Sequence, residues 1–138
     1  MVDKEQQQKL QQKYMEMQML QQQMQQVQKQ LQLIEQQLME LNMTKEAVEE
    51  LKNTEPGKEM LVPISSGIFV KGQIKDNKEL TVNVGSNVAV KKTIDETKGL
   101  IDTQIEEITN FQQELTMNMQ KLAVKSQEIE KELQKLVK

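Results

Sequence analysis

All five glycines and both prolines of this chain lie in one stretch, between Pro56 and Gly99. The stretches on either side are free of these helix breakers and are dominated by Gln, Glu, Lys, Leu and Met, which are good helix formers. The sequence therefore predicts a helix over residues 4–53, a β-rich middle over 58–92 and a second helix over 93–137. By its length of 138 residues, the chain is expected to be one domain.

Both predicted helices carry a heptad pattern. In the second helix, one apolar series recurs every seven residues, and a second, partly polar series follows it four residues later. In the first helix, the residues of the pattern are likewise separated by alternating steps of three and four. The members are Ile94, Ile101, Ile108, Leu115, Leu122, Ile129 and Leu136, with Lys98, Ile105, Gln112, Met119, Ser126 and Leu133, and in the first helix Met17, Leu20, Met24, Val27, Leu31, Ile34, Leu38, Leu41, Lys45 and Val48. Such spacing is typical of a coiled-coil seam. Because the helices have similar lengths and a short middle joins them, we expect an antiparallel hairpin.

The middle alternates apolar and polar residues, as half-buried strands do. Turn signals at 65–67, 75–78 and 85–87 divide it into four strands, and hence into two β-hairpins. Four short strands cannot bury a sufficient core alone, so we expect them to close a β-barrel with other subunits. The fold class is therefore α+β, with these predicted assembly residues: Val62, Ile64, Ile68, Val70, Ile74, Leu80, Val82, Val84, Val88 and Val90.

Composition argues against catalysis and against nucleic-acid binding. The chain has no histidine and no cysteine, which removes the commonest general base, the thiolate nucleophile and most zinc ligands. All 18 basic residues are lysines, the net charge is -3, and no basic stripe is evident. No phosphate-binding loop, signal peptide or membrane-spanning run is seen. We therefore expect a cytoplasmic protein that is not an enzyme, with no cofactor, no metal, no nucleic acid and no membrane as partner.

Apolar residues beyond the seam gather near the two chain ends, in the distal half of the predicted hairpin. Long helical rods tolerate scattered apolar residues, so these positions need have no function. Alternatively, a flexible surface rich in methionine can repack against many unfolded segments. On that hypothesis the client-binding residues, some of them shared with the seam, are Leu10, Tyr14, Met15, Met17, Met19, Leu20, Met117, Val124, Leu133, Leu136 and Val137.

The order helix, two hairpins, helix resembles a prefoldin subunit of the alpha class, and the lysine-rich, compact chain is more similar to archaeal members. The resemblance is strongest in the middle, at Glu59-Met60-Leu61-Val62-Pro63-Ile64, Gly67-Ile68-Phe69-Val70-Lys71-Gly72 and Val82-Asn83-Val84-Gly85. It implies a hexamer of two alpha-class and four beta-class subunits, with β-barrels as its body. It also implies coiled-coil tips that hold unfolded proteins without ATP and pass them to a group II chaperonin.

Two hypotheses of function follow. The first is a chaperone subunit that holds unfolded polypeptides, and the second is a structural scaffold or tether that assembles through its β middle and has inert arms. The surplus apolar residues near the chain ends favour the first hypothesis.

Overall fold

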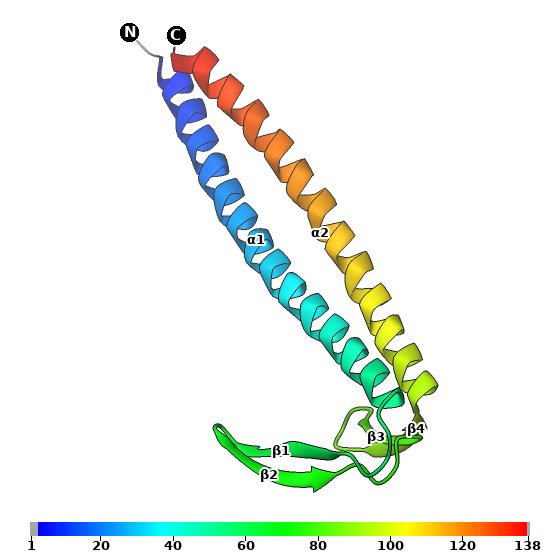
Figure 1. Cartoon of the computed structure of the whole chain (residues 1–138). Coiled ribbons are helices and arrows are strands. Elements are labelled where there is room, and N and C mark those ends of the chain that lie inside the picture. The colour runs from blue at the N-terminus through cyan, green and yellow to red at the C-terminus, as the bar shows by residue number, and fades with distance from the viewer. Residues whose placement is uncertain (1–2, 138) are drawn as a thin grey trace. The chain divides into compact units, whose positions relative to one another are not determined.

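A computed structural model describes residues 3–137. Its elements are α1 (Lys4–Lys52), β1 (Glu59–Ser65), β2 (Ile68–Gln73), β3 (Glu79–Asn83), β4 (Ala89–Thr93) and α2 (Ile94–Val137) (Figure 1). This confirms the predicted α+β fold of two long helices and two hairpins. The chain divides into two compact units. We call Met1–Gln37 with Ile108–Lys138 the terminal unit, and Leu38–Glu107 the central unit.

In the terminal unit, α1 and α2 run antiparallel (Figure 1). They pack through an apolar seam. Leu20, Ile129 and Leu133 form a buried cluster, against which Leu10, Met17 and Leu122 pack. Between the helices, the Ser126 hydroxyl donates to Met17 Sδ at 3.4 Å, and Lys13 Nζ lies 2.6 Å from a Glu132 carboxylate oxygen.

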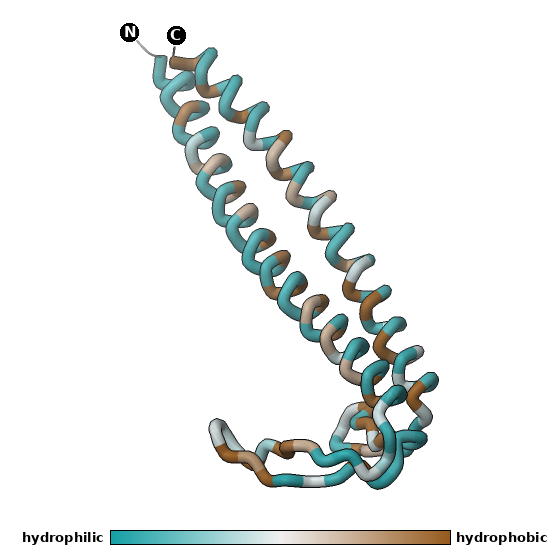
Figure 2. Tube along the Cα trace, in the orientation of Figure 1, coloured by the Kyte–Doolittle hydropathy of each residue, from teal (hydrophilic) through white to brown (hydrophobic). Residues whose placement is uncertain are grey.

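The seam confirms the heptad prediction. Every member of the predicted series in both helices is buried or half-buried, and hydrophobic residues recur along hydrophilic helices in Figure 2. Even so, the seam is thin: Ile34, among the most buried of its residues, keeps 5% of its surface exposed. No large side chain among residues 3–137 is fully buried.

In the central unit, the seam combines buried isoleucines with lysines. Ile94 and Ile101 are buried, while Lys45 and Lys98 occupy seam positions and each pairs with a carboxylate of the other helix. Lys45 Nζ lies 2.6 Å from Asp102, and Lys98 forms an ion pair with Glu49. The hydrogen bond between the latter two raises the pKa of Lys98 and lowers the pKa of Glu49. Because a shift in register would separate these pairs, we infer that they help to fix the alignment of the helices.

The Glu49–Lys98 pair predicts a small pH dependence of stability, small because exposed ion pairs are screened by solvent. Since folding lowers the Glu49 pKa, its contribution is present above the usual value of 4.5 and is lost as pH falls through the lowered pKa. Since folding raises the Lys98 pKa, its contribution is present below 10.5 and is lost as pH rises through the raised pKa. Glu49→Gln should lower the urea midpoint near neutral pH, and the difference from wild type should vanish well below 4.5. An unchanged difference at both pH values would contradict the pairing.

Each hairpin forms its own two-stranded antiparallel sheet. In the β1–β2 hairpin Val62 pairs with Val70 and Pro63 with Phe69, and the register shifts between Pro63 and Ser65 at a bulge. In the β3–β4 hairpin Val82 pairs with Val90. The turn at Gly85 holds three successive residues at positive φ, 115° at Gly85, 52° at Ser86 and 59° at Asn87. The Asn83 side chain supports this turn by accepting a hydrogen bond from the Gly85 amide at 3.0 Å.

The connection between the hairpins is tied to the end of α1 by one side chain. Asn77 Nδ2 donates to the Thr54 carbonyl at 2.8 Å and reaches the carbonyls of Leu51 and Lys52 at 3.4 Å each. The last carbonyls of a helix have no partner within the helix, so Asn77 supplies one. At the start of α2, the Glu96 amide donates a hydrogen bond to the Thr93 hydroxyl at 3.1 Å, which caps the helix.

Replacing Asn77 should loosen this junction. Asn77→Asp removes the amide donor and places an acceptor against three carbonyl oxygens. We expect the free energy of unfolding to fall by about 1–3 kcal/mol, the cost of leaving part-buried polar groups unsatisfied. Asn77→Ala, which removes the donor without adding an acceptor, should cost less. Urea denaturation followed by circular dichroism measures both, and equal stability of Asn77→Asp and wild type would contradict this role.

Candidate binding surfaces

The predicted assembly residues lie uncovered on the hairpins. Because directly paired residues share one face of a sheet, Val62 and Val70 lie together, as do Val82 and Val90. None of the ten is buried within the chain: Ile74, Leu80 and Val82 are half-buried, and Val62, Ile64, Ile68, Val70, Val84, Val88 and Val90 are exposed. We call these ten residues the valine face. Each hairpin also leaves the outer edges of its strands unpaired among residues 3–137.

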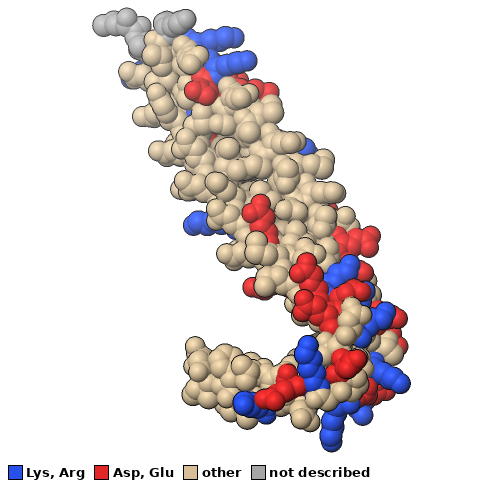
Figure 3. Space-filling view, viewed as in Figure 1, with Lys and Arg blue, Asp and Glu red and all other residues tan. Residues whose placement is uncertain are grey.

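The opposite face of the β1–β2 hairpin is apolar as well, which the sequence analysis did not include. Leu61 and Phe69 are 61% and 57% exposed there, with Pro63 paired to Phe69. No charged residue occurs from Leu61 to Val70, and Figure 3 shows the turn end of this hairpin uncharged. The opposite face of the β3–β4 hairpin is polar by contrast, with Thr81 paired to Lys91. The lack of charge between residues 61 and 70 was the signal in the sequence that could have revealed this second apolar face.

The predicted client-binding residues divide by burial. Tyr14, Met15, Met19, Met117, Val124 and Val137 are exposed; Leu10, Met17 and Leu136 are half-buried; Leu20 and Leu133 are buried. Leu20 and Leu133 keep only 7% and 9% of their surface, because both occupy heptad positions and pack in the seam. These two residues would become available to another chain only if the helices separated, and their part in client binding stays a prediction.

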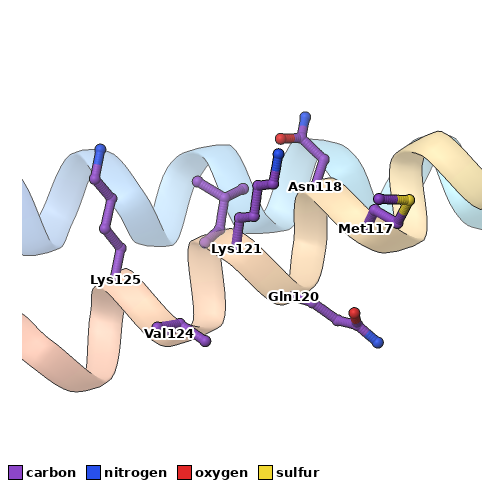
Figure 4. A pocket seen from close by; sticks show the side chains of 7 residues that line it. Met117, Asn118, Gln120, Lys121, Val124 and Lys125 are labelled. Carbon is purple, nitrogen blue, oxygen red and sulfur yellow. The ribbon is translucent and has the colours of Figure 1, made fainter.

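Two open grooves run beside the exposed methionines of the terminal unit. One, of about 570 Å³, is lined along α2 by Met117, Leu122 and Val124 with Lys121 and Lys125, and Val124 projects away from the neighbouring helix (Figure 4). The other, of about 190 Å³, is lined by Met19, Leu20 and Ile129 with Glu16 and Lys125. Lys125 therefore borders both grooves, and each offers apolar side chains beside a long, flexible cation.

The surface around the grooves carries few charges. No charged residue occurs from Met17 to Gln28, and glutamine fills most of the exposed positions there. Figure 3 shows a mostly uncharged surface over this part of the helices. Further exposed apolar residues that the sequence analysis did not single out are Leu33, Met39, Met43 and Phe111.

Among residues 3–137, no group of three or more Asp or Glu side chains could hold a metal ion. Within the same range, neither helix is long and apolar enough to cross a membrane.

Two long helices that flank a pair of separate β-hairpins define a class of coiled-coil subunits with strands for assembly. A sequence model described as prefoldin subunit matches residues 20–138, and the chain belongs to the prefoldin family. A solved structure of filamentous prefoldin from Methanocaldococcus jannaschii has the same fold, with a TM-score of 0.75 over 82% of this chain and 93% of that one at 19% identity.

Curated relatives indicate which type of prefoldin subunit this chain is most similar to. Prefoldin subunit alpha of Thermococcus onnurineus is 44% identical over 49% of this chain and 47% of its own length. Prefoldin subunit alpha of Thermofilum pendens is 32% identical over 61% and 65%, and that of Methanosphaera stadtmanae is 34% identical over 72% and 70%. The match thus spans about half to two thirds of these relatives, all of them archaeal alpha subunits.

Proposed function

We propose that this chain is an alpha-class subunit of a cytoplasmic chaperone that holds unfolded polypeptides without ATP and passes them to a group II chaperonin. The observation that carries this proposal is the set of apolar side chains that the coiled coil leaves exposed in the terminal unit, notably Met15, Met19, Met117 and Val124. They lie outside the heptad series, and Met19, Met117 and Val124 line two open grooves. Membership of the prefoldin family supports the same function.

Assembly is proposed to occur through the valine face. Burying exposed apolar strand residues contributes roughly 25 cal/mol per Å², and the unpaired strand edges gain hydrogen bonds when a further strand joins. A barrel made with beta-class subunits, two alpha with four beta, would cover the valine face and these edges. The exposed Leu61 and Phe69 are then available for contacts outside the barrel interior.

Holding is proposed to rest on weak contacts made by several subunits at once. Thioether side chains are flexible and polarizable, so one surface can fit many apolar segments. Each grip alone is weak, but linkage within one complex raises the effective concentration for the second contact. A client bound in this way needs no nucleotide for capture.

The proposal predicts that the assembled complex suppresses aggregation of a denatured test protein equally with and without ATP. Because the contacts are apolar, suppression should be similar at low and at high salt, whereas attraction between exposed charges is screened beyond about 10 Å in 0.1 M salt. Light scattering of the test protein at two salt concentrations, with and without ATP, measures both effects. A strict ATP requirement, or loss of suppression at high salt, would contradict the mechanism.

The scaffold hypothesis is the second candidate, favoured by the dense valine face, which provides for assembly whether or not the helices bind clients. It predicts a complex of normal mass that leaves aggregation of the test protein unchanged.

A further inference from the structure

Most methionines among residues 3–137 are exposed. Six methionines are exposed, namely Met15, Met19, Met39, Met43, Met60 and Met117. Met17, Met24 and Met119 are half-buried along the seam. The chain contains no cysteine, so methionine is its only residue type that carries sulfur. Three of the exposed thioethers, Met15, Met19 and Met117, belong to the surface proposed to hold clients.

Exposed thioethers react directly with peroxide. The sulfur attacks one peroxide oxygen, the O–O bond breaks, and that oxygen stays on sulfur as a sulfoxide while the other leaves as water. Sulfur is oxidised by two electrons and the peroxide is reduced by two. The product is polar and chiral, and methionine sulfoxide reductases can reverse it. A sulfoxide oxygen is a strong hydrogen-bond acceptor that is costly to remove from water, so it opposes contact with an apolar client.

We propose that Met15, Met19 and Met117 are three peroxide-sensitive modification sites, and that their oxidation weakens client holding reversibly without changing the fold. This inference rests on the proposed function. Met15 and Met19 are 64% and 60% exposed, and Met117 lines the larger groove. The seam is protected by comparison, since Met17 is half-buried and its sulfur already accepts a hydrogen bond from Ser126.

The test compares three forms of the complex purified with its partner subunits. They are wild type, Met15→Leu/Met19→Leu/Met117→Leu, and the matched control Met39→Leu/Met43→Leu, whose two methionines are 65% and 63% exposed in the central unit. Each is treated with graded hydrogen peroxide, and the peroxide is then removed. Mass spectrometry of peptides gives the oxidation at each methionine, native mass and circular dichroism report assembly and helicity, and light scattering reports holding.

Holding by each form after oxidation is compared with holding by the same form before treatment, so the comparison does not require the three untreated complexes to hold clients equally. After oxidation, wild type and the control should lose holding several-fold at unchanged mass and helicity, while the triple leucine variant should keep it. Treatment with methionine sulfoxide reductases, one for each epimer of the sulfoxide, should restore client holding by the wild-type complex. Unchanged holding by wild type with Met15, Met19 and Met117 oxidised, equal loss by the triple variant, or no recovery after reduction would overturn the inference. If untreated wild type does not hold clients, the proposed function itself fails, which is a distinct outcome.

Discussion

Replacing Val82 and Val84 by aspartate is expected to stop this chain from joining a complex while both helices still form. Val82 pairs with Val90 in the β3–β4 hairpin, and both substituted positions belong to the valine face. Within the single chain they are not buried, so added charge costs little there. Inside a closed barrel the same carboxylates would lose their hydration, at a cost of several kcal/mol each if they stay ionised.

Native mass spectrometry of the co-expressed subunits measures this effect, and circular dichroism reports the helices. The matched control is Thr81→Asp with Asn83→Asp, which adds the same two charges to the opposite, polar face of β3. Aspartate at position 83 keeps an acceptor for the Gly85 amide. If the control assembles normally and the Val82→Asp/Val84→Asp variant does not assemble, the valine face is the face of β3 that assembly buries. An unchanged oligomer of the Val82→Asp/Val84→Asp variant would rule out assembly through this face.

Replacing Met15, Met19, Met117 and Val124 by glutamine is expected to abolish most client holding at unchanged complex mass. All four side chains are exposed and lie outside the heptad series, so their loss should leave helix pairing intact. Glutamine is a good helix former, so local helix propensity is retained. Substitution is sharper than trimming residues 1–20 and 125–138, because trimming would also remove Leu20, Ile129 and Leu133 from the buried cluster.

The control is Met39→Gln with Met43→Gln, a pair of equally exposed methionines in the central unit. Light scattering measures aggregation of the test protein. The control should still suppress this aggregation, and the quadruple variant should suppress it much less. Equal loss in both would show that holding is not confined to the terminal unit. Full retention by the quadruple variant would favour the scaffold hypothesis.

The periodic parts of this structure could be predicted from the sequence because periodicity reports burial directly. The heptad series, the two hairpins and the helix start at Thr93 follow from local spacing and local hydrogen bonding. The hydrogen bonds from Asn77 to the end of α1 could not be predicted from the sequence, since the partners of Asn77 lie 23 to 26 residues earlier in the chain. Local patterns carry no information about such a long-range contact.

The exposure of the predicted binding residues could not be read from the sequence, for a related reason. Leu20 and Leu133 were assigned both to the seam and to client binding, and only packing shows that the seam buries them. Leu61 and Phe69 lie on the opposite face of the β1–β2 hairpin from the predicted assembly residues, and their exposure is known only from the folded chain. Exposure separates residues that hold the subunit together from those available to other chains, and exposure depends on the folded chain.

The thinness of the seam has a mechanical consequence. Since no large side chain of the described residues is fully enclosed, each layer of the coiled coil is stabilised mainly by the layers directly before and after it. Opening can therefore begin at the ends of the helices and advance one layer at a time, at a small free-energy cost for each layer. Such a structure is compliant near the ends of its helices. Under the proposed function, this compliance would let the separation of the two helices there adjust to clients of different width.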